Sequence, residues 1–273
     1  MTTRNDFVEA NRQCWDEAAE FHRRHPQYAA LLRGFRNPGF SCLDETATTW
    51  LTRVGIEGRD VAQLCCNNGR ELLSVRNMGA GRCVGFDQSA AFLSQARELA
   101  AVGGIDCTFV ETDVHAIGPE FDAAFDIVVV TIGVFGWMPD LDAFLAVVSR
   151  LLRPGGRFFV YEEHPILNMV DLDIHSSPAT LRFSYFKGEP FVDTDGLDYW
   201  SGRPYPSKPC YWFPHPLGKI VTGCVEKGLA IERLEEFSHN ISEKSFLEKQ
   251  DAQLPLSYLL IARKEGEAPP RRA

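Results

Sequence analysis

The stretch from Val61 to Ser89, VAQLCCNNGRELLSVRNMGAGRCVGFDQS, decides the fold of this chain. It begins with a short apolar run, Val61–Leu64, which predicts a buried strand, and continues through the small, polar turn Cys65–Gly69. A helical pattern follows, and a second predicted strand, 82–86, ends beside the acid Asp87. Strand, tight turn, helix, strand and acid is the order by which α/β sheets hold a nucleoside-containing cofactor. The turn exposes backbone N–H groups, and the acid accepts hydrogen bonds from a ribose diol.

The turn after the first strand differs from the dinucleotide fingerprint. It contains no G-x-G-x-x-G, and Gly69 is its only glycine. Asn67 tolerates a positive φ better than most residues, so we expect the turn to close without further glycines. We interpret the adjacent Cys65 and Cys66 as the small residues that a tight cofactor turn requires, with a redox pair as the alternative.

The composition is that of an ordinary globular protein. Of 273 residues, 45% are hydrophobic and 24% are charged. The net charge of −9 disfavours a nucleic-acid partner, because phosphate neutralisation needs clustered Lys and Arg. The sequence contains no run of eighteen apolar residues, so it predicts no membrane-spanning helix. The polar N-terminus argues against a signal peptide. The cysteines form no C-x-x-C and the histidines show no metal-ligand spacing, so we expect a cytoplasmic protein with no metal site and no membrane partner.

From Val61 the chain alternates strands with helices. The apolar patterns predict strands near 61–64, 82–86, 107–110, 125–130 and 157–161, and helices near 70–78, 89–102 and 140–152. The continuously apolar strands are typical of a parallel sheet covered on both faces. Upstream, helical spacing covers 5–24 and 44–54, and the region between them contains Pro26. Leu152–Gly156 predicts a turn that ends a helix before the fifth strand.

After Tyr161 the pattern changes. Residues 162–214 are rich in aromatics, Pro, Gly and Asp without a sustained period, which predicts a lid or a substrate-binding insertion. Helical spacing returns over 215–228, and two further strands are predicted through 231–234 and 257–262. We expect the tail GEAPPRRA to be disordered.

Together these residues resemble a class I S-adenosylmethionine-dependent methyltransferase over nearly the whole chain. The family's first strand and turn, D-L-G-C-G-x-G, correspond to Gln63–Gly69, with Gln63 in place of the usual acid. The acids that follow the family's second and third strands correspond to Asp87 and Asp113, and its L-x-P-G-G turn corresponds to Leu152–Gly156. The stretches NRQCWDEAAEFH and YWFPHPLGKIV are similar to a bacterial subgroup that acts on small molecules.

The resemblance implies an α/β, Rossmann-like fold. We expect a seven-stranded, mostly parallel sheet with an antiparallel C-terminal strand pair and helices on both faces. An N-terminal helical cap would cover 1–58, and the S-adenosylmethionine-binding domain would cover 59–264. The insertion 162–214 would follow the fifth strand, and 265–273 would form the disordered tail.

The resemblance also implies which residues hold S-adenosylmethionine. The backbone of the turn would contact the methionine part, Asp87 the ribose hydroxyls, and Asp113 the adenine amino group. The full set comprises Trp15, Tyr28, Gln63, Cys65, Cys66, Asn67, Gly69, Asp87, Gln88, Asp113, Val114, Thr131 and Gly133. Trp15 and Tyr28 are expected to close over the cofactor, with core packing as the alternative for both.

Two histidines are the candidates for a catalytic base. Methyl transfer from a sulfonium is an in-line displacement that depends on alignment, and a base helps where the nucleophile carries a proton. His164 follows the predicted fifth strand, and His215 opens the helix after the insertion, so that both can face one pocket. Glu162 and Glu163 lie near the mouth of that pocket. A structural role, bonding to backbone, is the alternative for each histidine.

The acceptor is expected to be a small molecule methylated at O, N, S or C. The fourth strand is followed by Thr131–Val134 and not by the (D/N)-P-P-(Y/F) tetrad, which marks family members acting on amino groups of nucleobases or glutamine. The expected wall of an apolar substrate pocket comprises Trp137, Tyr199, Trp200, Tyr211, Trp212 and Phe213. One alternative is the same fold using its cofactor for another transfer or for regulation. A nicotinamide-dependent oxidoreductase is the other, and it predicts a sixth parallel strand.

Overall fold

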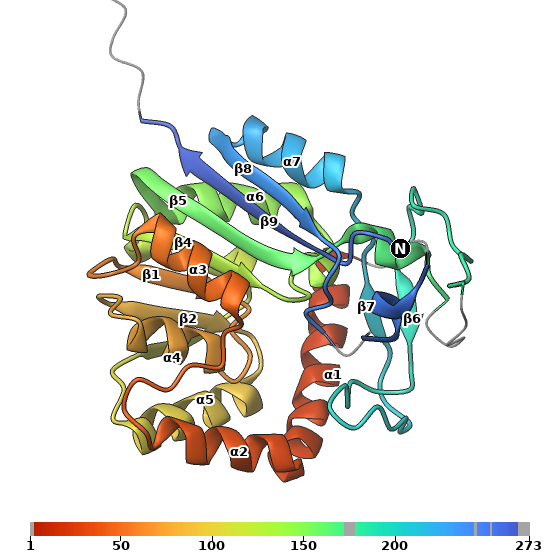
Figure 1. Cartoon of the computed structure of the whole chain (residues 1–273), viewed down its shortest axis with the longest axis horizontal. Helices are drawn as coiled ribbons and strands as arrows, with labels where there is room; N and C mark the ends of the chain where they lie inside the picture. The colour runs from red at the N-terminus through yellow and green to blue at the C-terminus, as the bar shows by residue number, and fades with distance from the viewer. Residues whose placement is uncertain (1–2, 172–177, 243–244, 252, 267–273) are drawn as a thin grey trace, which may run out of the picture.

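A seven-stranded sheet forms the centre of the molecule (Figure 1). The computed structural model describes residues 3–171, 178–242, 245–251 and 253–266. Five strands are parallel, namely β1 (Val61–Leu64), β2 (Cys83–Asp87), β3 (Thr108–Glu111), β4 (Phe125–Thr131) and β5 (Leu152–Glu163). Two further strands, β8 (Leu229–Phe237) and β9 (Ser257–Lys264), run antiparallel beside β5. The order is β3-β2-β1-β4-β5-β9-β8, which confirms the expected fold class.

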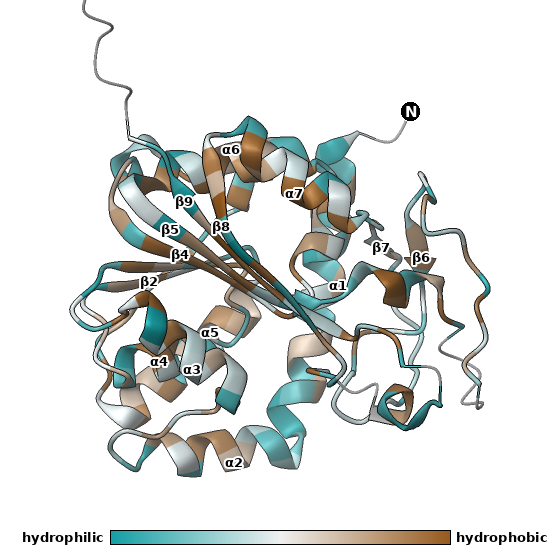
Figure 2. Cartoon of the chain, turned by 45° about the horizontal axis from the view of Figure 1, so that its top comes forward, coloured by the Kyte–Doolittle hydropathy of each residue, from teal (hydrophilic) through white to brown (hydrophobic). Residues whose placement is uncertain are grey.

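Helices cover both faces of this sheet (Figure 2). One face carries α3 (Glu45–Val54), α4 (Arg70–Asn77) and α5 (Ala90–Gly103), and the other carries α6 (Leu141–Leu151) and α7 (Leu217–Glu226). Val128 and Val130 of β4 belong to the core under α6, whereas Ile127 and Val129 belong to the core under α4. Because both faces are buried, the parallel strands are continuously apolar in sequence.

The N-terminal region contains two helices, α1 (Arg4–Arg24) and α2 (Pro26–Phe35). A capping box, in which Thr3 and Asp6 bond each other's backbone N–H, begins α1. The sequence analysis did not predict α2. Proline is tolerated at the first helical position, where the N–H has no partner in the helix, and the side chain of His25 caps the same end.

The sequence analysis predicted that Leu152–Gly156 forms a turn between a helix and the fifth strand, but these residues are part of the strand itself. Helix α6 ends at Leu151, and β5 begins at Leu152, which pairs with Phe125. The register between β4 and β5 shifts after Phe125, and Gly155 takes a φ of 80°, so that the Pro-Gly-Gly sequence is absorbed as an irregularity inside a long strand.

The insertion packs against α1, beyond the carboxyl ends of the parallel strands (Figure 1). It carries the antiparallel pair β6 (Phe191–Asp193) and β7 (Cys210–Trp212). Buried Asn11 of α1 holds β7 through two hydrogen bonds, donating from Nδ2 to the carbonyl of Tyr211 at 3.0 Å and accepting from its N–H at 2.7 Å. This clamp fixes the insertion to the N-terminal helix.

Short 3₁₀ helices complete the chain. They are η1 (Val114–Ala116), η2 (Pro119–Phe121), η3 (Phe135–Trp137), η4 (Pro165–Met169) and η5 (Ser245–Lys249). Within the described part of the chain, every helix is too short or too polar to cross a bilayer. The expected disorder of the tail concerns residues that, from 267 onward, lie outside the described part.

We expect Asn11→Ala to lower the free energy of unfolding by about 1–3 kcal/mol, because it leaves the buried N–H and C=O of Tyr211 without partners. Urea denaturation measures the change. Asn5→Ala, on the exposed part of the same helix, is the matched control. Because alanine favours helix more than asparagine, propensity would stabilise both variants, so an Asn11→Ala variant as stable as Asn5→Ala would show that the clamp contributes nothing.

Candidate active site

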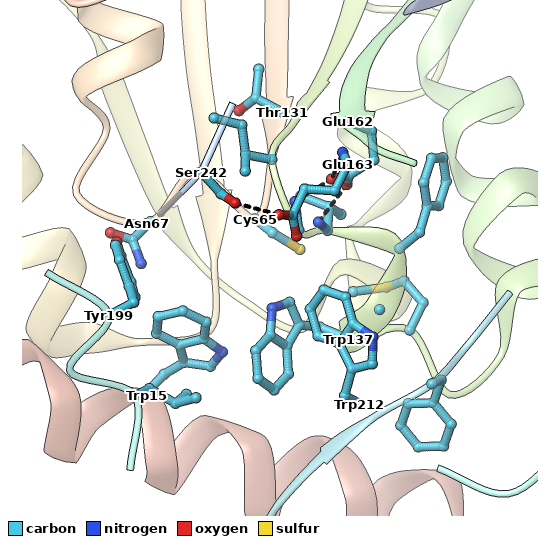
Figure 3. A pocket seen from close by; sticks show the side chains of 18 of the residues that line it. Trp15, Cys65, Asn67, Thr131, Trp137, Glu162, Glu163, Tyr199, Trp212 and Ser242 are labelled. Atoms are coloured by element: carbon cyan, nitrogen blue, oxygen red, sulfur yellow. Dashed lines mark hydrogen bonds between the residues drawn. The ribbon is translucent and has the colours of Figure 1, made fainter. Parts of the chain in front are cut away.

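A cavity of about 910 Å³ opens at the carboxyl ends of the parallel strands. The turn after β1, the ends of β2, β4 and β5, the segment after β3, helix α1 and the insertion all contribute residues to it (Figure 3). Thirteen of the fifteen site residues expected from the sequence line this cavity; Gly69 and Tyr28 do not.

The turn after β1 closes through three positive φ angles, 53° at Cys65, 51° at Asn67 and 70° at Gly69. The sequence analysis anticipated this conformation at Asn67 but not at Cys65. Burial raises the pKa of the Cys65 and Cys66 thiols well above its usual value, and neighbouring carboxylates raise it further. Neither thiol is therefore activated, which argues against the redox interpretation.

Asp87 joins β2 to this turn. One carboxylate oxygen accepts from the N–H of Asn67 at 2.7 Å and the other from the N–H of Ser89 at 2.9 Å. Each oxygen thus retains one lone pair, which is the acceptor arrangement that a vicinal diol needs. Burial raises the pKa of Asp87 to about 6, although the backbone N–H groups of Ser89, Asn67 and Gln88 oppose this effect.

Asp113 begins η1 and accepts from both the backbone N–H and Nδ1 of His115, each at 3.0 Å. Burial raises the pKa of Asp113, but these hydrogen bonds outweigh burial and lower it below its usual value. One carboxylate oxygen, Oδ2, remains for a ligand. Gln88 and Val114 line the cavity on either side of this acid.

Two buried amide side chains at the turn are only partly satisfied. Gln63 donates from Nε2 to Oγ1 of Thr131 at 3.0 Å, but its Oε1 has no hydrogen-bond partner among the described residues. Nδ2 of Asn68 likewise lacks a partner within the described part of the chain. Gln63 lines the cavity, so a ligand donor beside the turn, such as the amino group of a methionine, would satisfy its Oε1, whereas Asn68 does not line the cavity.

Glu162 was placed near the pocket by the sequence but given no role. It is the second-last residue of β5 and is 3% exposed. Its carboxylate accepts from the backbone N–H of Gly133, of Val134 at 2.7 Å and of Glu163 at 2.9 Å. Burial raises its pKa to about 7 despite these donors. The sequence signal was available, because an acid directly after an apolar strand is the same pattern that identified Asp87.

Gly69 and Tyr28 are corrected. Gly69 is needed for packing, because a Cβ there would lie 2.7 Å from the ring of Phe109. Tyr28 is 2% exposed in the core, and its hydroxyl donates to Glu98 at 2.8 Å. The core alternative therefore holds for Tyr28, whereas Trp15 lines the cavity.

Aromatic rings form the wall opposite Glu162 and Thr131 (Figure 3). Trp137 packs edge-on against both Trp15 and Trp212, with ring centroids 5.1 Å apart in each pair. Three more of the predicted wall residues line the cavity, namely Tyr199, Trp200 and Phe213. Tyr211 does not, because its ring packs on Phe7 at the outer side of α1.

His164 and His215 differ in whether a ring nitrogen keeps a free lone pair. Nδ1 of His164 accepts from the N–H of Ile166 at 3.1 Å, and Nε2 lies 2.8 Å from Oε1 of Glu236. The proton of the neutral ring is therefore on Nε2, and no lone pair remains for a base. This arrangement favours the structural alternative for His164, although the residue lines the cavity. His215 donates from Nε2 to the carbonyl of Met138 at 2.8 Å and keeps Nδ1 as an acceptor.

Comparisons with known proteins agree with this geometry. Residues 61–156 match a family model described as a methyltransferase domain. A ubiquinone biosynthesis O-methyltransferase from Sinorhizobium medicae is 28% identical over 172 residues, which cover 62% of this chain and 66% of the relative. A tRNA U34 carboxymethyltransferase from Nautilia profundicola is 28% identical over 56% of this chain and 52% of its own. The matched regions thus span between about half and two thirds of these relatives.

The fold recurs in solved structures. An S-adenosylmethionine-dependent methyltransferase from Mesorhizobium loti superposes with a TM-score of 0.59 at 21% identity, covering 79% of this chain and 96% of that one. The sheet order, the turn after β1 and the free lone pairs of Asp87 all fit the same cofactor. Residues 61–156 therefore form a methyltransferase domain, the fold is that of S-adenosylmethionine-dependent methyltransferases, and S-adenosylmethionine is the cofactor that this domain and this fold indicate.

Proposed function

We propose that the protein transfers the methyl group of S-adenosylmethionine to a small, partly apolar acceptor. The observation that carries this proposal is that the two ends of this cavity are lined by unlike groups. The end at β1 and β2 offers the carboxylates of Asp87 and Asp113 and the unsatisfied amide oxygen of Gln63. The end under the insertion is walled by Trp15, Trp137 and Trp212. An enclosed aromatic wall suits an acceptor with its own apolar surface.

In this proposal the cofactor lies along the carboxyl ends of β1, β2 and β3. Cys65, Cys66 and Asn67 of the turn and Gln63 hold the methionine part, Asp87 holds the ribose, and Asp113 with Val114 holds the adenine. Thr131 and Gly133 lie under the sulfonium, which is the electrophile that the cofactor supplies when bound. The chain's own contribution is to align the acceptor and to exclude water.

The charge of the cavity favours an acceptor without phosphate groups. Arg70 is the only Lys or Arg that borders the cavity in the described part of the chain, and its Nε already donates to Glu71 at 2.6 Å. With the net charge of −9, this supports a small molecule over a nucleic acid. The relatives named as ubiquinone biosynthesis O-methyltransferases add support for an oxygen acceptor.

The proposal is tested by incubating the protein and S-adenosylmethionine with a metabolite extract and searching by mass spectrometry for products heavier by one CH₂. Calorimetric titration of S-adenosylmethionine against NAD is the companion measurement. Binding of NAD alone would contradict the cofactor, and cofactor binding without any methylated product would contradict the transfer.

We expect Asp87→Ala to weaken S-adenosylhomocysteine binding about 100-fold or more. Two hydrogen bonds to a carboxylate contribute about 1.5–3 kcal/mol each. Isothermal titration calorimetry measures the dissociation constant. Asp106→Ala, at an exposed position before β3, serves as the control. Wild-type affinity in a folded Asp87→Ala variant would place the ribose elsewhere.

Cofactor affinity should also depend on pH through Asp87. Its pKa of about 6 in the free protein means that acid conditions protonate the acceptor of the ribose hydroxyls. Binding should therefore strengthen up to about tenfold as the pH rises from 5 to 7, since each pH unit below the pKa corresponds to about 1.4 kcal/mol. Asp87→Ala should abolish this dependence. An affinity that falls with rising pH would contradict the assignment.

We expect His164→Ala to lower stability and to leave the catalytic rate within about tenfold of wild type. The ring caps η4 through Ile166 and faces Glu236, so its loss costs about 1–3 kcal/mol of folding free energy. Thermal unfolding and turnover are measured together. A turnover loss of 10²-fold or more with unchanged stability would restore His164 as a base.

A further inference from the structure

We propose that Glu162 and Tyr258 form a seat for an uncharged hydroxyl group of the acceptor, and that Oε2 of Glu162 receives the proton of that hydroxyl during methyl transfer. This inference rests on the proposed function and names the chemical class of its acceptor. It adds a catalytic residue and a specificity residue to the site.

The strand register places the two side chains together. Glu162 of β5 and Tyr258 of β9 are direct partners in the antiparallel ladder, so both side chains project from the same face of the sheet. Both border the cavity. Glu162 is also tied to the backbone of Gly133 and Val134, at the end of β4. The pair therefore lies where the fourth strand meets the cavity, next to the proposed position of the sulfonium.

Tyr258 carries an unused polar atom. The residue is fully buried, and its hydroxyl has no hydrogen-bond partner among the described residues. Leaving a buried hydroxyl unpaired costs folding free energy, and buried polar groups of native proteins are almost always paired. A ligand atom that enters this end of the cavity would supply the missing partner.

Lone-pair counting shows what Glu162 still offers. Its Oε1 accepts from the N–H groups of Gly133 and Glu163, and its Oε2 accepts from the N–H of Val134 alone. A carboxylate oxygen has two lone pairs, so one acceptor position remains on Oε2. The three backbone N–H groups hold the carboxylate in one orientation, which keeps that position directed by the fold and not by a flexible side chain.

A hydroxyl satisfies both groups with one atom. It donates its proton to Oε2 of Glu162, accepts from the hydroxyl of Tyr258, and keeps one lone pair for attack. A carboxylate or phosphate would instead meet the charge of Glu162, and no Lys or Arg other than the paired Arg70 lines the cavity in the described ranges. An ammonium group has no lone pair with which to attack.

The transfer balances without a further reactant. The hydroxyl oxygen forms a bond to the methyl carbon, the bond from that carbon to sulfur breaks, and its electron pair stays on the sulfur. The positive charge of the sulfonium is thereby neutralised, and the hydroxyl proton passes to Oε2 of Glu162, which returns it to solvent after product release.

The electrostatic surroundings suit this role. Burial raises the pKa of Glu162 to about 7, so that the carboxyl is a proton acceptor near neutral pH. The titratable groups facing it are Glu163 on β5, Tyr258 on β9 and Cys65 after β1. Burial keeps the pKa of both Tyr258 and Cys65 well above its usual value, so neither of them titrates near neutrality.

The seat is tested first by binding, with simple probes. Phenol and toluene differ by a hydroxyl in place of a methyl on the same ring, and saturation-transfer NMR with the S-adenosylhomocysteine complex compares them. We expect phenol to bind wild type at least fivefold better than toluene, benzylamine and benzoate, and Tyr258→Phe to remove this preference. Equal binding of phenol and toluene, or preference for either charged probe, would overturn the proposal.

Tyr161→Phe is the matched control for Tyr258→Phe. Tyr161 lies on β5, directly before Glu162, in the strand that pairs with β9. It does not line the cavity, and its hydroxyl donates to Asp44 at 2.8 Å. We expect Tyr161→Phe to keep the phenol preference and to lower the melting temperature. Tyr258→Phe should leave the melting temperature unchanged or raise it. A melting temperature lowered equally by Tyr258→Phe would mean that its hydroxyl is paired within the fold, and the seat would be rejected.

The proton acceptor is tested with an acceptor recovered from the extract screen. Glu162→Gln should lower kcat about 10²- to 10⁴-fold and remove the acidic limb of the pH–rate profile near pH 7, with S-adenosylhomocysteine affinity unchanged. His215→Asn should retain that limb. The opposite result would assign the proton to Nδ1 of His215. Failure of cofactor binding would contradict the proposed function itself, whereas intact cofactor binding with no phenol preference contradicts this inference alone.

Discussion

The position of the site follows from one constraint, the divergence of the chain after β1 and after β4. These strands are neighbours, but the helix that follows β1 packs on one face of the sheet and α6, which follows β4, packs on the other (Figure 2). A crevice must then open between their carboxyl ends, and ligands of open α/β sheets bind at such a switch point. Gln63 on β1 and Thr131 on β4 bridge the crevice through one hydrogen bond of 3.0 Å.

Two carboxylates, half-buried Asp87 and buried Glu162, organise the two sides of that crevice in the same way. Asp87 is the last residue of β2 and Glu162 the second-last of β5, each accepts backbone N–H groups, and each keeps at least one lone pair without a partner in the described part of the chain. Burial raises the pKa of both, to about 6 and about 7. Hydrogen bonds from backbone N–H groups hold the carboxylates in place, and the remaining lone pairs can accept hydrogen bonds or a proton from a ligand. The same oxygen atoms therefore serve both the fold and the site.

The remaining wall comes from parts of the chain that the sheet does not contain. Helix α1 brings Trp15, and the insertion brings Trp212, while Trp137 between them belongs to η3. Asn11 holds α1 and β7 together, so that the N-terminal helix and the insertion build the aromatic wall jointly. A Cβ at Gly136 would lie 2.2 Å from the ring of Trp212, which shows how closely the insertion packs on the segment after β4.

The sequence by itself determined the sheet and the cofactor end of the site, because both depend on local patterns. Apolar runs give buried strands, and an acid after such a run gives Asp87 its place. It did not determine α2, where a proline begins a helix, nor the start of β5, where the pairing with Phe125 absorbs a Pro-Gly-Gly sequence. Tertiary structure alone decided that Tyr28 is core, that His164 caps η4 and lies beside Glu236, and that Tyr258 stands beside Glu162. These facts depend on contacts between residues far apart in the chain, which no local pattern encodes.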